Sequence, residues 1–286
     1  MRPNQAGMTL VELVMAIAVS SIVATFSITL LSAPPVTMEN SARRSSLRET
    51  ATLGLQQLGG ELRSALPNSI RFRNTAGVLA VEHLNVLDAS ILFSDDPGVA
   101  AAQRLTIGMP DSQLETLGSF VRIAKPFVSS RAFLALHHTG LGGANAYSLT
   151  NVMTAAATQI QIDSGSSAGQ DQVRLTPAAL FTTIGAARRV YLVSGPISYL
   201  CDPVARQLRR YAGYLPNASQ LARDTDAELM AAGATRSILA SNVGNCRMTA
   251  VPLISAGQVT HSLTITFTSG TESLRLTTEN VSETAG

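Results

Sequence analysis

The chain has 286 residues, of which 14% are charged and 5% aromatic, and its 21 basic and 19 acidic side chains leave a net charge of +2. This balance gives no indication of a nucleic-acid-binding protein. Once the apolar N-terminal segment is set aside, roughly 250 residues remain, enough for one large domain or two small lobes.

The most distinctive stretch begins at the N-terminus. Arg2 is the only charge before Glu12, and residues 14–31 carry no charge at all. As a helix, residues 8–33 would be roughly 39 Å long, which exceeds the apolar thickness of a bilayer, about 30 Å. Pro34 and Pro35 follow and disfavour helix. The sequence therefore predicts a membrane-spanning helix that ends or kinks near Ala33.

Glu12 is unusual inside such a helix. A carboxylate in an apolar helix costs about 2.5–3.5 kcal/mol at the middle of a bilayer, and less near its edge. If the chain were cut after Gly7, Met8 would gain a free amine. That amine and the Glu12 carboxylate of a neighbouring subunit would attract each other strongly in an apolar setting. We expect this pair to set the axial register between packed helices.

The segment from Gly7 to Glu12, followed by the apolar run, resembles the prepilin signature of type IV pilins and of the pseudopilins of type II secretion. In that family a membrane-embedded prepilin peptidase cuts after the glycine and N-methylates the next residue. The resemblance implies a leader of residues 1–7, cleavage between Gly7 and Met8, methylation of Met8, and an assembly role for Glu12. The family more often has Phe at the position of Met8.

An ordinary secretory signal peptide is the alternative. It would need an apolar core of about 7–15 residues and a site of small residues for cleavage. This run is longer, contains Glu12 and ends in a poor cleavage site. The apolar run is followed by Arg43, Arg44 and Arg48. A count of positive charges on the two sides of the run would place these residues, and the head, in the cytoplasm. Long domains, however, cross the membrane largely regardless of such charges. We expect an inner-membrane anchor with a periplasmic head.

Residues 36–66 are predicted to form a second, amphipathic helix. Leucine and alanine recur at three- and four-residue steps, which marks one buried face. The positions are Leu47, Ala51, Leu55, Leu58, Leu62 and Leu66. Gly59 and Gly60 weaken the helix by about 1 kcal/mol each relative to alanine. A long N-terminal helix with an apolar half and an amphipathic half is the pilin arrangement.

Residues 67–286 are predicted to form a β-rich head, which makes the expected fold class α+β, with the helix packed on an antiparallel sheet. Short β-rich runs occur at 70–72, 78–86, 105–107, 120–127, 159–162, 173–175, 188–200 and 208–214. Residues 208–214 are expected to pair back on 188–200. The alternation in 263–276 around Gly270 predicts a hairpin with one buried face. Residues 224–232 are a candidate short helix, and 140–146 and 164–170 are candidate loops.

Cys201 and Cys246 are the two cysteines. An even number of cysteines in an exported domain favours one disulfide. By chain-entropy arguments, this cross-link would stabilise the folded domain by about 4 kcal/mol. The alternatives are two buried thiols or a labile redox pair.

A finer resemblance lies in residues 66–71 and in residues 193–201 followed by 208–211. These segments resemble the O-type minor pilins of mannose-sensitive haemagglutinin (MSHA) pilus biogenesis. The resemblance implies a minor subunit that primes or caps a pilus. By architecture, the J-type minor pseudopilin of type II secretion is the nearest alternative.

The head gives no catalytic set, so we expect a protein that is not an enzyme and that has no cofactor. His137 and His138 lack a metal-ligand pattern and are expected in a solvated loop. Asp163 and Asp171 could hold calcium through oxygen atoms, but the EF-hand spacing is absent. Residues 95–98 are predicted to form a turn.

Three hypotheses follow. The first is a structural minor pilin whose partners are the prepilin peptidase, the lipid bilayer, major and other minor pilins and the inner-membrane assembly platform. The pilin would leave the inner membrane for the pilus and the cell surface. The second is a pseudopilin of type II secretion. The third is a membrane-anchored binding module such as an adhesin, although the absence of tryptophan argues mildly against sugar stacking.

Overall fold

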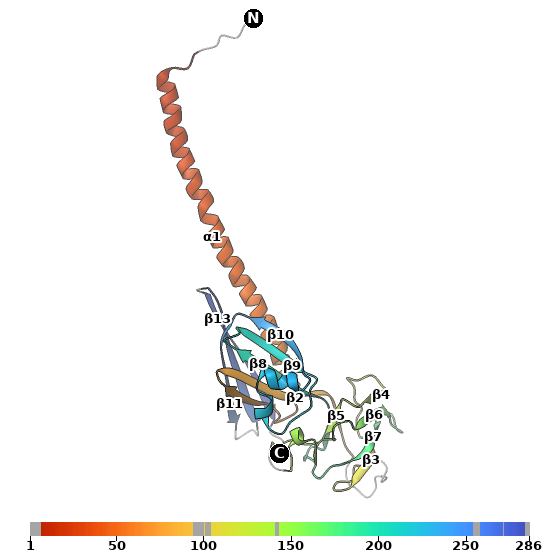
Figure 1. The fold of residues 1–286 in the computed structure, drawn as a ribbon. Helices are drawn as coiled ribbons and strands as arrows, with labels where there is room; N and C mark the ends of the chain where they lie inside the picture. The colour runs from red at the N-terminus through yellow and green to blue at the C-terminus, as the bar shows by residue number, and fades with distance from the viewer. Residues whose placement is uncertain are drawn as a thin grey trace. The chain divides into compact units, whose positions relative to one another are not determined.

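The computed structural model describes residues 7–93, 100, 104–140, 143–253, 258–270 and 272–283 (Figure 1). The side chains of residues 29–40, 253 and 283 lie outside this description, as does the turn predicted at 95–98. The chain forms an apolar N-terminal helix and a head rich in antiparallel sheet, which confirms the α+β class. It divides into two compact units, Met1–Glu49 and Thr50–Gly286.

Helix α1, Leu10–Arg63, belongs to both units and is continuous. The sequence predicted that the helix ends or kinks near Ala33 and that a second helix starts at residue 36. The helix does not end there, so the predicted end is wrong, whereas the kink stays a prediction. Pro34 and Pro35 each remove one backbone donor and cost about 3 kcal/mol in a helix interior. This cost is local, because the residues on either side of the two prolines are still helical.

The helix also ends earlier than predicted, at Arg63 instead of Leu66. Beyond it, the backbone pairs with strand β2, Val78–Ile91. The Leu66 amide donates to the Leu84 carbonyl at 2.7 Å, and the Val86 amide donates to the Ser64 carbonyl at 2.8 Å. These bonds satisfy backbone groups that a longer helix would have used.

The described residues of the head form three antiparallel sheets. The main sheet has the strand order β1-β2-β8-β9-β10, and β5 pairs with β8 outside this order. Besides β2, its strands are β1 Arg71–Thr75, β5 Phe133–Ala135, β8 Arg189–Asp202, β9 Gln207–Ala212 and β10 Thr235–Ser241. The insert sheet has the order β3-β7-β6-β4, with β3 Pro110–Thr116, β4 Phe127–Ser129, β6 Gln159–Ser164 and β7 Asp171–Leu180. The C-terminal sheet is β11-β12-β13, formed by Val243–Leu253, Gln258–Ser269 and Glu272–Glu283.

Most of the predicted strands are confirmed. Strand β9 pairs with β8 as expected, and β12 and β13 form the predicted C-terminal hairpin. The short helix is α2, Asp226–Ala231, capped by Thr225 and Glu228. Residues 164–170 form a loop, as expected. Turns 146–148 and 220–223 are 3-10 helices.

The strands predicted at 105–107 and 120–127 are wrong, apart from Phe127 at the start of β4. In the second segment, carboxylates replace a partner strand as backbone acceptors. The Phe120 amide donates to Asp171 at 2.6 Å, and the Arg122 amide donates to Asp88 at 2.6 Å. Side-chain acceptors from distant positions cannot be identified from a β-rich run alone.

The insert sheet lies between β2 and β8 in the sequence, although these two strands are direct neighbours in the main sheet. The insert has its own hydrophobic core, in which Leu114, Ile160, Val173 and Phe181 are fully buried. Val190 and Leu192, at the start of β8, belong to the same core. The head is therefore one compact unit in which the insert sheet has a hydrophobic core of its own.

The last turns of α1 pack on the head through the predicted apolar face. Ala51, Leu55, Leu58 and Leu62 are buried. Two glycines bring the helix close to its neighbours. A Cβ atom at Gly54 would lie 3.1 Å from the Leu239 carbonyl oxygen, and one at Gly59 would lie 2.7 Å from Thr278 Oγ1. Gly59, which looked only destabilising in the sequence, is required by this close approach.

A polar cluster joins the same helix to the main sheet. Glu61 accepts a hydrogen bond from the Tyr199 hydroxyl and pairs with Arg210 at 2.8 Å. Burial alone opposes the charged form of Glu61, but the bonds from Tyr199 and Arg210 outweigh it and lower the Glu61 pKa. His83 stacks on Tyr199 with ring centroids 6.1 Å apart. His83 is 0% exposed, and neither ring nitrogen has a hydrogen-bond partner among the residues that the structure describes.

Cys201 and Cys246 form the predicted disulfide. Cys201 lies in β8 of the main sheet, and Cys246 lies in β11 of the C-terminal sheet. The bond closes 45 residues of chain and ties the two sheets together. The structure therefore supports a cross-link between sheets.

The two adjacent glycines of α1 are expected to respond oppositely to alanine. Gly60→Ala should stabilise the head by up to about 1 kcal/mol, since its Cβ would lie an ordinary 3.9 Å from Arg63 Nη2. Gly59→Ala should destabilise it by about 1–3 kcal/mol through overpacking against Thr278. Urea unfolding of the full chain in detergent measures both changes. Thr278→Ala should rescue Gly59→Ala, and equal effects at the two glycines would contradict the packing.

The buried His83 predicts acid sensitivity. Burial lowers the His83 pKa from 6.5 to about 4, so the unfolded chain gains a proton first as the pH falls. The free energy of unfolding should therefore fall as the pH drops from 6.5 to about 4, and His83 should account for about 3 kcal/mol of this fall. Urea unfolding at several pH values checks this. His83→Leu should remove only the share of the pH dependence that His83 supplies, because the pKa of His138 is also lowered to about 4. An unchanged slope in that variant would be the contrary result.

Candidate processing and assembly segment

Gly7, Met8 and Thr9 precede α1, and Gly7 and Met8 are exposed. A Cβ atom added at Gly7 would meet no other atom within 4 Å, so nothing in the described chain requires glycine there. A requirement for glycine at this position would have to come from another molecule that binds the segment. An exposed backbone next to a helix start is accessible to a peptidase.

Thr9 and Glu12 form a reciprocal cap at the start of α1. The Thr9 amide and hydroxyl each donate to Glu12 Oε2 at 3.1 Å, and the Glu12 amide donates to Thr9 Oγ1 at 3.4 Å. This is a capping box, which satisfies backbone donors that the first turn leaves without partners. The Thr-x-x-Glu spacing was visible in the sequence, but its local role was missed because Glu12 was interpreted only through a neighbour's amine.

The helix beyond the cap is suited to an apolar environment. Leu10–Ile28 has a mean hydropathy of 2.1 and is long and apolar enough to cross a bilayer, judged by length and composition. Three of its hydroxyl groups donate to carbonyls of the same helix: Ser21 to Ala18 at 2.8 Å, Thr25 to Ser21 at 2.8 Å, and Ser27 to Val23 at 2.8 Å. These side chains therefore need no outside partner.

The histidine pair of the head is arranged differently from the prediction. His138 does not lie in a solvated loop but is buried, with its Nδ1 accepting a hydrogen bond from the Ala146 amide at 3.0 Å. The loop around it folds inward because Tyr147 packs edge-on against this ring. Burial and the charge of Arg71 lower the His138 pKa to about 4. His138 is thus a core residue.

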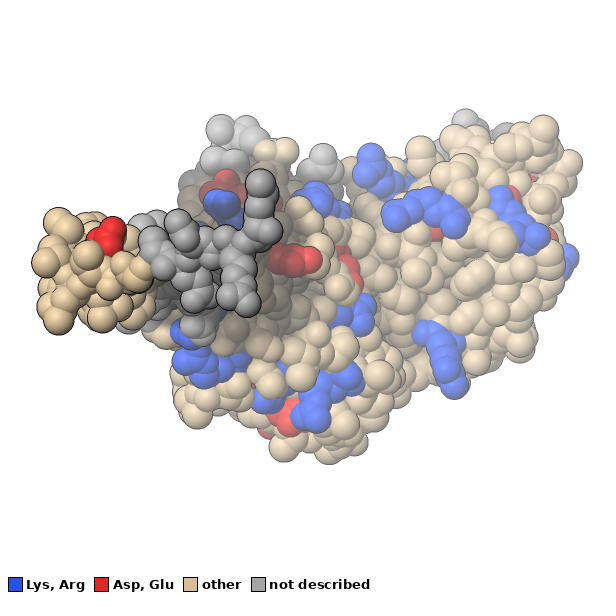
Figure 2. All heavy atoms as spheres, turned by 90° about the horizontal axis from the view of Figure 1, so that it is seen from above, with Lys and Arg blue, Asp and Glu red and all other residues tan. Residues whose placement is uncertain are grey.

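The candidate calcium ligands have other partners. Asp171 pairs with Lys125 at 2.6 Å, and Asp163 pairs with Arg174 at 3.1 Å. Within the described ranges, no three or more His, Cys, Asp or Glu side chains are grouped to hold a metal ion. On the face of the head seen in Figure 2, basic and acidic side chains are scattered and separated by neutral surface.

Comparison with known proteins gives one match. Residues 2–28 match the prokaryotic N-terminal methylation motif, a segment that contains Gly7, Met8 and Glu12. No curated protein and no solved structure matches the chain. The motif, leading into an apolar helix, supports a protein of the type IV pilin kind, a class that includes the pseudopilins. It implies processing by a prepilin peptidase, anchoring in a membrane and assembly with other pilins.

Proposed function

We propose that this chain is a structural minor pilin that enters or primes a type IV pilus of the MSHA type. The prepilin peptidase cuts between Gly7 and Met8 and N-methylates Met8. The inner membrane then holds the subunit, with its head in the periplasm, until the assembly platform adds it to the major and other minor pilins. The observation that carries the proposal is the methylation motif at residues 2–28, which leads into an exposed apolar helix.

The apolar helix makes lateral assembly favourable. None of the window Leu10–Ile28 is buried within the chain, and Leu10, Ile17 and Phe26 are each more than 60% exposed. Burying one such side chain is worth about 1.5–3 kcal/mol. Lipid supplies this burial first, and neighbouring helices in the filament core supply it after assembly. The proposed role of the chain is accordingly structural, with no catalytic step.

Glu12 is proposed to have two roles. Within its own chain it caps α1 through Oε2. Its second oxygen, Oε1, is then available to the Met8 amine of a neighbouring subunit. In an apolar filament core this attraction is strong enough to fix the register of the two helices.

Two substitutions separate these roles. Glu12→Gln keeps a capping side chain but removes the charge, whereas Glu12→Ala removes both. If the charge sets the register, both variants should insert in the membrane normally and enter filaments at a small fraction of the wild-type level. Quantitative blotting of purified filaments measures this. Normal entry of Glu12→Gln, with a defect in Glu12→Ala alone, would assign Glu12 to capping only.

A deletion distinguishes the proposal from the type II secretion alternative, which has the same anchor. Loss of the gene should reduce surface pili and leave exoprotein release unchanged. The opposite pattern would assign the chain to the pseudopilins. If both pili and secretion were normal, and the head bound a surface ligand without any pilin, the anchored binding module would replace both.

A further inference from the structure

We propose that strand β13 and helix α1 form a docking site for an extended segment of a partner protein. The segment pairs with the free edge of β13 and lies in the groove beside α1, with a carboxylate over Arg63. The inference goes beyond the proposed pilus function and does not depend on it, because it rests on the head alone.

The first observation is the edge of the C-terminal sheet. Strand β13, Glu272–Glu283, has 12 residues, and in the described part of the chain it pairs with β12 alone. Its other side therefore presents a row of backbone donors and acceptors, which is a ready template for another strand. β13 contains neither proline nor lysine, although it does carry Arg275 and three glutamates, Glu272, Glu279 and Glu283.

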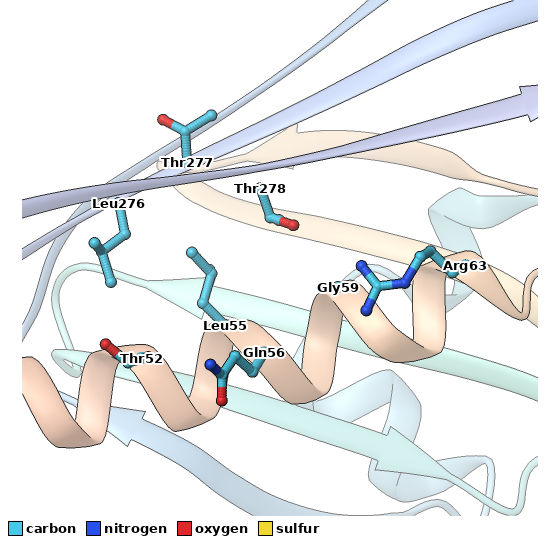
Figure 3. Close-up of a pocket in the computed structure, with 8 residues that line it drawn as sticks. All are labelled: Thr52, Leu55, Gln56, Gly59, Arg63, Leu276, Thr277 and Thr278. Atoms are coloured by element: carbon cyan, nitrogen blue, oxygen red, sulfur yellow. The ribbon is translucent and has the colours of Figure 1, made fainter.

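The second observation is a groove of about 270 Å³ between β13 and α1 (Figure 3). Leu276 and Thr278 point from the strand toward the helix, and Leu55 points back toward the strand, whereas Thr277 points away. Gly59 lies on the helix opposite Thr278 and keeps the two elements close. Side chains on one face of an added strand would lie over this groove, because alternate residues of a strand face the same side.

The third observation is the charge at one end of the groove. Arg63 is exposed and has no ion pair within the described part of the chain. Its guanidinium lies near Gly59 and Gly60, whose added Cβ atoms would stand 3.7 and 3.9 Å from its nitrogens. Arg63 already complements the helix dipole, but its position also favours an acidic side chain on whatever occupies the groove.

The geometry argues against a second copy of this chain as the partner, with its own β13 paired to the β13 of the first. Helix α1 lies directly against β13, since Asn280 Nδ2 donates to the Leu62 carbonyl at 2.7 Å. Paired strands are about 4.8 Å apart, whereas packed helices need about 8–10 Å. A two-fold pair of β13 strands would bring the two helices too close. The segment that pairs with β13 is therefore a strand of a partner protein that carries no helix against the same face.

The test uses the full chain in detergent and labelled octapeptides of alternating threonine and valine, with one central aspartate or lysine. We expect the aspartate peptide to slow amide hydrogen exchange in β13 and to bind up to about fivefold more tightly than the lysine peptide, the size of one exposed ion pair. Arg63→Glu should reverse that preference. Arg247→Glu, an equal charge change on β11, should leave it unchanged.

Three outcomes would overturn the proposal. The first is that neither peptide protects β13. The second is a charge preference that survives Arg63→Glu or disappears equally in Arg247→Glu. The third is protection of β13 that rises with protein concentration when no peptide is present, because that result would make a second copy the occupant. Amide exchange across the main sheet in the same samples shows whether each variant is folded.

Discussion

The exposed apolar surface of Leu10–Ile28 is the constraint on which the rest of the molecule depends. A helix without a polar face has to be buried in lipid or among other helices. With about 1.5–3 kcal/mol for each large side chain, keeping this surface in water would cost tens of kcal/mol. None of this window is buried within the described chain, so lipid or neighbouring helices have to supply the burial.

The same helix is also part of the head. Its last turns contribute Leu58 and Leu62 to the core, and Gly54 and Gly59 bring its backbone against the sheets. Glu61 adds a charged bond to Arg210 from the main sheet. One continuous element thus carries both the apolar segment and a structural part of the head.

Local patterns predicted much of this arrangement. The apolar run, the leucine stripe and the alternation in β12 and β13 each depend on neighbouring residues, and each gave the correct element. The cysteine pair was also correct. The helix break was wrong because proline was judged by its local cost alone. Strand β10 was missed because exposed positions such as Arg236 and Ser237 give it little apolar alternation.

Long-range chemistry could not be predicted in the same way. The segment after Leu117 looked like a strand, but the carboxylates of Asp88 and Asp171 accept its amides from distant positions. His138 looked solvated, yet its ring is enclosed by Tyr147. The sequence also predicted processing between Gly7 and Met8 and an assembly role for Glu12, and these roles stay predictions. The reciprocal bonds of Thr9 and Glu12 emerged only with the structure.

The central claim is that this helix is the mature N-terminus of a pilin-type subunit. Intact mass and N-terminal sequencing of the protein from membranes, with and without the prepilin peptidase, test it most directly. The chain should start at N-methylated Met8 only when the peptidase is present. A chain that keeps Met1 in both cases, or that starts just after Ala33, would contradict it.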